Sequence, residues 1–191
     1  MHSEALPAEK RVVLSAAADA SVRSCTQNRA GRLKRRSVVG MELSELAGRE
    51  AVRDLVARYT WAGDRGRSTE LSELFSPNGV LDVGAHGGRW VGRAEIVSQL
   101  DAVAERVATA GTSPGPVRHH VSSLVIEVTT PTEATASSYF LVLTGIGVDH
   151  WGRYRDRFAV GPDGSWRFIE RSVRVDGHTT GSLMVRPPVS K

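Results

Sequence analysis

The chain has 191 residues, 40% of them hydrophobic and 24% charged, which suffices for one globular domain with a sizeable core and is too few for two ordinary domains. The net charge of +4 comes from residues 1–40, where eight Lys or Arg stand against three acids. The remainder is nearly neutral, which argues against nucleic acid as a partner of the domain. The single cysteine, Cys25, excludes a disulfide framework and fits a cytoplasmic location, and the lack of an apolar run of about 18 residues argues against a membrane span.

The two ends of the chain differ in composition from its middle. Residues 1–40 mix Ala, Ser and Arg, contain no aromatic residue and show no sustained period, so we expect a basic arm that is disordered or loosely attached. Residues 185–191 contain two prolines and are expected to form an irregular tail. Residues 41–184 are therefore the predicted domain.

Two helices open the predicted domain. Residues 42–63 have the i, i+3, i+4, i+7 spacing of an amphipathic helix, and Gly63 is a natural stop signal. A shorter helix fits residues 68–75, and the sequence Ser-Pro-Asn-Gly at residues 76–79 predicts a turn. The inward-facing stripe of the first helix consists of Val52, Leu55, Val56 and Tyr59.

Strands dominate the rest of the chain. Short strands are expected at residues 80–83 and 89–91, followed by a helix at residues 93–110. Because helices and strands do not alternate regularly, the predicted fold class is α+β. A curved sheet wrapped over one long helix leaves a conical, mostly apolar pocket between the two. The four long strands of an antiparallel meander are expected at residues 117–129, 135–148, 151–160 and 165–175.

Several segments together resemble a known family. They are Tyr-Thr-Trp-Ala-Gly-Asp-Arg-Gly at residues 59–66, Gly-Arg-Ala-Glu-Ile at 92–96, Arg-His-His-Val-Ser-Ser at 118–123, and shorter stretches at 71–75, 80–82, 152–154 and 166–168. Through them, residues 42–184 resemble the SnoaL-like branch of the nuclear transport factor two superfamily. The resemblance implies a cone-shaped, cystatin-like roll, in which a curved antiparallel or mixed sheet wraps around a long helix. It is more specific for fold than for activity, because this scaffold carries many unrelated functions.

The resemblance also implies a set of site residues. The superfamily includes scytalone dehydratase, bile acid dehydratase, steroid isomerase, polyketide cyclases and limonene epoxide hydrolase. In the two dehydratases an Asp after the first helix and a His at the start of the first long strand work as a pair, and Asp64 and His119 match these positions. Tyr59 matches a Tyr that precedes the Asp of the bile acid enzyme by five residues, whereas Tyr139 falls near a second pocket histidine of the scytalone enzyme, so a two-histidine site is not implied. The implied roles are general acid/base for His119, orientation of the imidazole for Asp64, and donation to an oxyanion for Tyr59 or Tyr139.

The residue types themselves suit this chemistry. An imidazole has a pKa near 6.5, so it exchanges protons near neutral pH, and a carboxylate bonded to its other nitrogen stabilises the imidazolium. His119 and His120 are consecutive on an expected strand, so only one can face the pocket, and the resemblance favours His119. Asp64 reaches the pocket only if the first helix ends near Gly63, since an unbroken helix places it about 130° from the apolar stripe. If the helix does not end there, Asp64 is an exposed carboxylate.

Further residues are candidates for the pocket lining, with core packing as the alternative for the aromatic ones. Arg153 or Arg171 could reach a substrate oxygen or pair with a carboxylate on a sheet face. No cofactor or metal motif is found, because the glycines of residues 145–152 connect two strands and adjacent strand histidines cannot converge on one ion. The lining candidates are Trp61, Val56, Trp90, Phe140, Trp151, Arg153 and Phe168.

The predicted function is a cofactor-independent dehydratase, isomerase or cyclase for a hydrophobic small molecule such as a polyketide, terpenoid or steroid. One alternative is an epoxide hydrolase, which needs an Asp–Arg–Asp constellation that the sequence does not clearly present. The other is a non-catalytic protein of the same fold that binds a ligand or serves as a partner subunit. A homodimer is expected in either case. The separation of Asp64 and His119 discriminates between catalysis and binding, because catalysis requires both groups within hydrogen-bond reach inside a closed pocket.

Overall fold

The computed structural model describes residues 40–109, 115–182 and 184–185. The expectations for the basic arm and for nearly all of the tail concern residues outside these ranges. Three helices are present in the described part of the chain, and each begins within one residue of its predicted start. They are α1 (Leu43–Gly63), α2 (Ser68–Glu73) and α3 (Arg93–Thr109).

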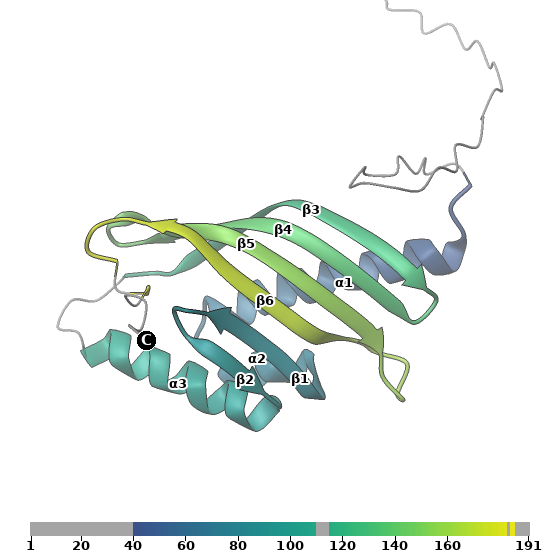
Figure 1. Cartoon of the computed structure of the whole chain (residues 1–191), viewed down its shortest axis with the longest axis horizontal. Helices are drawn as coiled ribbons and strands as arrows, with labels where there is room; N and C mark the ends of the chain where they lie inside the picture. The colour runs from purple at the N-terminus through teal and green to yellow at the C-terminus, as the bar shows by residue number, and fades with distance from the viewer. Residues whose placement is uncertain (1–39, 110–114, 183, 186–191) are drawn as a thin grey trace, which may run out of the picture. The chain divides into compact units, whose positions relative to one another are not determined.

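A six-stranded mixed sheet forms the other layer. Its strand order is β2-β1-β6-β5-β4-β3, in which β1 and β6 run parallel and every other neighbouring pair is antiparallel. Figure 1 shows the sheet as a curved layer with the three helices on one side of it. This arrangement confirms the predicted α+β class and the curved mixed sheet packed on a long helix. The strands are β1 (Phe75–Gly84), β2 (Gly88–Val91), β3 (Arg118–Thr130), β4 (Glu133–Thr144), β5 (Gly147–Val160) and β6 (Trp166–His178).

The turn predicted at residues 76–79 is wrong, because these residues belong to strand β1. Phe75 pairs with Phe168 and Val80 pairs with Glu170, so five steps along β1 correspond to two steps along β6. The turn-forming residues are therefore accommodated as an irregularity within the strand. Backbone pairing on both sides of the segment overrides its local preference for a turn.

The main hydrophobic core lies between α1, α2 and the inner face of the sheet. The predicted stripe of α1 supplies Val52, Leu55 and Val56, all of them buried, and Tyr59 packs against the same cluster. A second, smaller cluster joins Phe140, Val142 and Tyr154 near the other end of the sheet, and it borders the pocket described below. Among the described residues, no helix combines the length and the apolar character that crossing a membrane requires.

Gly152 marks a point where β5 and β6 approach too closely for a side chain. A Cβ at this position would collide with the Arg174 carbonyl oxygen and would lie 2.8 Å from Cζ of Phe140. We therefore expect Gly152→Ala to lower the free energy of unfolding by about 1–3 kcal/mol, as overpacking of a well-packed region does. Denaturant titration would measure the loss. Gly63→Ala is the matched control, because its Cβ would make only an ordinary 3.5 Å contact with Leu71 Cδ1; an equal loss in both variants would contradict the steric account.

Candidate active site

A pocket of about 810 Å³ lies between α3 and the inner face of the sheet, and it reaches the C-terminal end of α1. This volume lies within the range of about 300–1,000 Å³ that is usual for small-molecule sites. Its walls are largely apolar, with contributions from Leu81, Val83, Leu100 and Val173. Polar side chains enter it from the end of α1, from α2 and α3, and from the starts of β3 and β5. The pocket is therefore suited to a hydrophobic molecule that meets a few polar groups.

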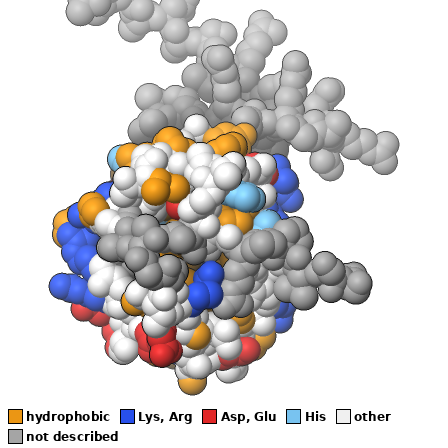
Figure 2. All heavy atoms as spheres, turned by 90° about the vertical axis from the view of Figure 1, so that its left-hand side faces the viewer, with side chains coloured by type: hydrophobic (Ala, Val, Ile, Leu, Met, Phe, Trp, Pro, Cys, Tyr) orange, Lys and Arg blue, Asp and Glu red, His pale blue; other side chains and the backbone are white. Residues whose placement is uncertain are grey.

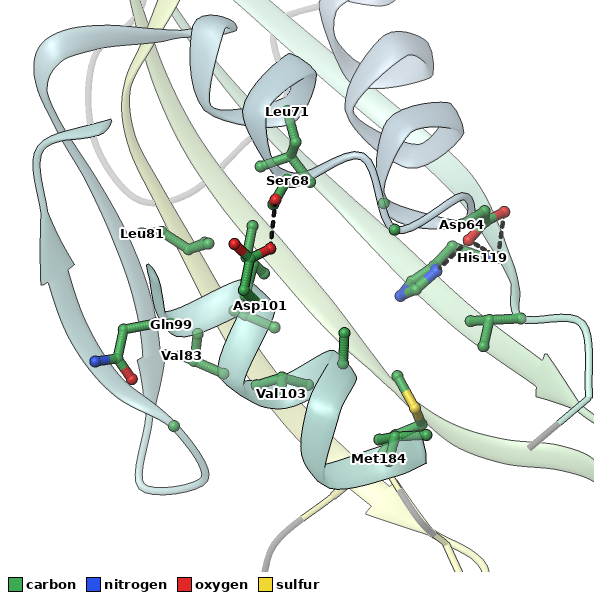
Figure 3. Close-up of a pocket in the computed structure, with 18 of the residues that line it drawn as sticks. Asp64, Ser68, Leu71, Leu81, Val83, Gln99, Asp101, Val103, His119 and Met184 are labelled. Carbon is green, nitrogen blue, oxygen red and sulfur yellow. Dashed lines mark hydrogen bonds and ion pairs between the residues drawn. The ribbon is translucent and has the colours of Figure 1, made fainter. Parts of the chain in front are cut away.

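Asp64 and His119 form a close pair on the pocket wall. Nδ1 of His119 lies 2.6 Å from Oδ1 of Asp64, and the backbone N–H of His119 donates to both carboxylate oxygens at 3.1 and 3.2 Å. Figure 3 shows the two side chains meeting, with the imidazole directed into the pocket. A carboxylate accepts hydrogen bonds, so Nδ1 is the nitrogen that donates; Nε2 then carries a lone pair in the neutral ring and a second proton in the imidazolium. This arrangement fixes one tautomer and leaves Nε2 available for proton exchange.

The end of α1 carries Asp64 into this position. The helix ends at Gly63, and Asp64 follows as its C-cap with αR geometry, its N–H donating to the Thr60 carbonyl at 2.9 Å. Thr60, Gly63 and Asp64 line the pocket together, and i, i+3, i+4 spacing places them on one face. The chain therefore does not need to turn away from the helix, because Thr60, Gly63 and Asp64 continue the pocket wall next to Tyr59, the last residue of the apolar stripe.

A second Asp–His pair lies in the same pocket, and we had not predicted it. His150, at the start of β5, lines the pocket, and its Nδ1 lies 2.7 Å from Oδ1 of Asp149. The ring of His150 faces the ring of His119, with 6.4 Å between their centroids. Burial lowers the pKa of His150, an effect that the neighbouring carboxylate of Asp149 opposes. With His86, three histidines line the pocket, and the rings of His119 and His150 lie close together, which corrects the expectation drawn from Tyr139.

Two tyrosines and a buried ion pair complete the polar groups at this end of the pocket. Tyr59 and Tyr154 both line it, and burial raises the pKa of each phenol, so both stay protonated at neutral pH. The Arg171 guanidinium lies 4.1 Å from the Tyr59 ring centroid and 4.2 Å from that of Tyr154. Arg171 donates to both oxygens of Asp156, at 2.9 and 2.7 Å, and both side chains are 0% exposed. Arg171 therefore supports the two rings from behind and is not itself a pocket-lining residue.

Several of the predicted lining residues lie elsewhere. Tyr139 is 59% exposed and Trp61 is 62% exposed, so neither reaches the pocket. Trp151 and Arg153 lie on the outer face of β5, where Arg153 pairs with Asp176 at 3.5 Å. The cause for Tyr139, Trp151 and Arg153 is strand alternation, because their immediate neighbours in the chain are the residues that face inward.

The remaining candidates divide between the core and the pocket. Val56 and Phe168 are buried in the main core, where Phe168 stacks on Phe75 with ring centroids 5.1 Å apart, and neither belongs to the pocket lining. Trp90 and Phe140 do line the pocket. His120 is exposed on the opposite face of β3 from His119.

The pocket also has a polar region between α2 and α3. Ser68 donates to Asp101 at 2.5 Å, and both residues line the pocket, as Figure 3 shows.

Figure 2 shows the end of the domain where β3 begins and β6 ends, and there histidine and hydrophobic side chains are exposed close together. Within the described ranges, no group of three or more His, Cys, Asp or Glu side chains is arranged to hold a metal ion.

Comparison with known proteins identifies the family. The family model described as "SnoaL-like domain" matches residues 44–172, which is more than half of the chain. The chain belongs to the SnoaL-like family. The search of curated proteins gave no significant match.

Solved structures share the SnoaL-like fold. A protein from Catenulispora acidiphila is 29% identical, with a TM-score of 0.61 over 71% of this chain and 96% of that one. An NTF2-like protein with a cystatin-like fold from Novosphingobium aromaticivorans is 25% identical, with a TM-score of 0.58 over 74% and 94% of the two chains. A candidate scytalone dehydratase from the same organism is 21% identical, with a TM-score of 0.62 over 78% and 97%. The last likeness is one of fold alone.

Proposed function

We propose that this SnoaL-like protein is a cofactor-independent enzyme that moves protons on a hydrophobic small molecule, in the class of dehydratases, isomerases and cyclases. The observation that carries the proposal is the 2.6 Å contact between Asp64 and Nδ1 of His119 on the wall of the pocket. Asp64 holds the ring and stabilises its charged form, and Nε2 of His119 exchanges a proton with the substrate. A polyketide, terpenoid or steroid-like molecule suits the apolar walls.

The reactions of this class share a proton transfer that an oriented imidazole can perform. Elimination of water from a β-hydroxy ketone, allylic isomerisation and aldol-type cyclisation each require proton transfer at a carbon next to a carbonyl. The carbonyl oxygen becomes negative as that proton leaves, so a hydrogen-bond donor aimed at it lowers the barrier. Tyr59 and Tyr154 are the candidate donors, because both line the pocket and both remain protonated.

Tyr59→Phe tests the donor role of the first tyrosine. Removing its hydroxyl is expected to lower kcat for water elimination about a hundredfold, as removal of one oxyanion donor does. The measurement is the rate of conversion of 3-hydroxy-1-tetralone to 1-naphthol. Tyr139→Phe is the matched control, because this phenol is exposed on the outer face and its loss should leave the rate unchanged. If Tyr59→Phe keeps the full rate and Tyr154→Phe has a reduced rate, the donor is Tyr154 and not Tyr59.

The proposal as a whole is tested with a panel of bicyclic β-hydroxy ketones that includes 3-hydroxy-1-tetralone. The protein is expected to accelerate the loss of water from at least one of them, and His119→Gln is expected to abolish the acceleration. His120→Gln serves as the control on the opposite face of the same strand. Binding of the ketones with no acceleration by the unaltered protein would instead support the non-catalytic, ligand-binding function.

Exposed hydrophobic side chains on the outer face of the sheet support the expectation of a homodimer. Val125, Tyr139 and Trp151 are large hydrophobic side chains that are exposed on β3, β4 and β5. An exposed apolar patch on a sheet is a frequent site of association between protein chains. The molar mass in solution, measured by light scattering, checks this expectation. A monomer at micromolar concentration would contradict it.

A further inference from the structure

In the Asp149–His150 pair, as in the Asp64–His119 pair, a short hydrogen bond joins the imidazole Nδ1 to a carboxylate oxygen. The Asp149 carboxylate is buried, and its Oδ1 accepts from His150 Nδ1 at 2.7 Å and from the Ser182 hydroxyl at 2.6 Å. The Thr144 hydroxyl lies 3.5 Å from Oδ2. A buried carboxylate is costly unless it is bonded in this way. Because the carboxylate accepts from Nδ1, the lone pair of His150 resides on Nε2.

The two histidines present their rings to the same space. In the sheet register Val142 of β4 pairs with His119 on one side and with His150 on the other, so all three side chains lie on the inner face. The ring planes are inclined at 88°, with 6.4 Å between centroids, and both residues line the pocket. Two imidazoles thus lie close together on the wall of one cavity.

The two imidazoles cannot readily carry a proton each. His150 is faced by Asp149 of its own strand, His119 of β3 and His178 of β6, with Asp64 beyond His119; α3 contributes Arg106 to the pocket lining. Burial lowers the pKa of His150, and the positive charges that His119 and His178 gain on protonation lower it further. The His150 side chain is also the less exposed of the two, at 11% against 21% for His119. Burial therefore favours the neutral form of His150, whereas the carboxylate of Asp64 lies where it can stabilise a positive charge on His119.

We infer that His150 is a second catalytic residue, the base that removes the proton from carbon, while His119 is the acid that protonates the departing hydroxyl of a β-hydroxy ketone. The inference rests on the proposed function and narrows it to the elimination of water. A base alone can serve an isomerisation, because the same group returns the proton that it takes. Elimination needs a proton removed at one atom and a proton delivered at its neighbour.

The proposed step balances in atoms and charge. Nε2 of His150 takes the α-proton, and the electron pair of the C–H bond forms an enolate. The carbonyl re-forms as that pair makes the carbon–carbon double bond and expels the β-hydroxyl group. Nε2 of His119 gives its proton to this oxygen, which leaves as water. His150 is then protonated and His119 neutral, and one proton transfer between them, direct or through water, restores the starting state.

Two reactions separate the roles of the two histidines. Exchange of the α-protons of 1-tetralone with deuterium oxide needs only the base, whereas conversion of 3-hydroxy-1-tetralone to 1-naphthol needs the base and the acid. His150→Gln is expected to lower both rates at least about a hundredfold. His119→Gln is expected to lower the elimination by a similar factor and to leave the exchange within about threefold of the original rate. His120→Gln, which alters an exposed histidine on the opposite face of β3, should change neither rate.

The outcomes distinguish this inference from the proposed function. Full elimination by His119→Gln would refute the proposed function, whatever His150→Gln does. Full elimination by His150→Gln, with elimination lost in His119→Gln, would overturn only the role of His150. Exchange that survives in His150→Gln and is lost in His119→Gln would also overturn the inference, because it reverses base and acid.

A pH titration followed by nitrogen-15 NMR tests the inference without measuring turnover, and its first part uses only the unaltered protein. In the unaltered protein the His150 ring is expected to become protonated below the usual range of an imidazole, because burial lowers its pKa. In His119→Gln the midpoint of His150 should move to higher pH, because a neighbouring positive charge is gone. A His150 midpoint above the usual range of an imidazole, or one that does not respond to the substitution, would contradict the role of His150 as the neutral base.

Discussion

Asp64→Asn is expected to lower the rate of water elimination from 3-hydroxy-1-tetralone by about a hundredfold to ten-thousandfold. The carboxylate accepts both from Nδ1 of His119 and from the His119 backbone N–H. An amide has one accepting oxygen and carries no charge, so it can no longer stabilise the imidazolium. If its NH₂ group faces Nδ1, the ring must also take the other tautomer, which removes the lone pair from Nε2. The measurement is kcat at saturating hydroxy ketone.

Two controls separate chemistry from folding in this variant. The thermal midpoint of Asp64→Asn should stay close to that of the unaltered protein, because the amide has the same shape. Asp163→Asn replaces an exposed carboxylate in the β5–β6 turn that is bonded to Arg167 and lies outside the pocket, so its rate should be unchanged. Unaltered kcat in Asp64→Asn would show that the pair has only a structural role.

Arg171→Met is expected to give the largest loss of stability, about 3–5 kcal/mol of unfolding free energy. Arg171 and Asp156 are both completely buried and joined by two hydrogen bonds, so removing the cation leaves an uncompensated carboxylate in the core. The contacts of the guanidinium with the Tyr59 and Tyr154 rings are lost as well. Denaturant unfolding measures the change.

The double variant Arg171→Met with Asp156→Leu is the matched control for this loss. Replacing both members of a buried ion pair by apolar residues of similar size is often close to neutral, because neither charge then has to be desolvated. We expect the double variant to recover most of the stability that Arg171→Met loses. A double variant as unstable as the single one would show that shape, and not the unpaired charge, accounts for the effect.

The fold was largely predictable because its periodic patterns are long. The apolar stripe of α1 and the alternation along β3 to β6 each extend over ten or more residues, so tertiary packing agrees with local preference. The errors lie at residues 76–79, where a short local signal for a turn competes with the strand pairing that flanks it, and at the β4–β5 turn, which was expected at residues 149–150 and lies at residues 145–146. The register between β1 and β6, which joins segments about ninety residues apart, has no local signature.

The site residues that match positions of a known family were predicted, and the site residue that matches none of its motifs was not. Asp64, His119 and Tyr59 match family positions, and all three line the pocket. His150 matches none of the quoted motifs, and its segment was considered only for its glycines. A signal was nevertheless present, because Asp149-His150 is a carboxylate next to an imidazole at the start of a long strand.

Strand alternation explains the wrong lining residues. Tyr139 and Phe140 are adjacent on β4, so both could not face the pocket, and the structure places Phe140 inside. The same rule separates Trp151 from its neighbour His150. Two adjacent residues of a strand cannot both face the pocket, so alternation excludes one member of each pair of adjacent candidates, as it does for the two histidines of β3. It could not have decided which one, because that depends on the register of the whole sheet.

The most direct test of the central claim is a long-range proton–nitrogen-15 NMR spectrum of the histidine rings, recorded at neutral pH with and without 1-tetralone. If Asp64 and His119 form the acid–base site, Nδ1 of His119 carries a proton bonded to Asp64, and the Nε2 resonance of His119 shifts when the ketone enters the pocket. The Asp64→Asn variant assigns the signal. An Nε2 proton with a bare Nδ1, or an Nε2 resonance that does not respond to the bound ketone, would contradict the account.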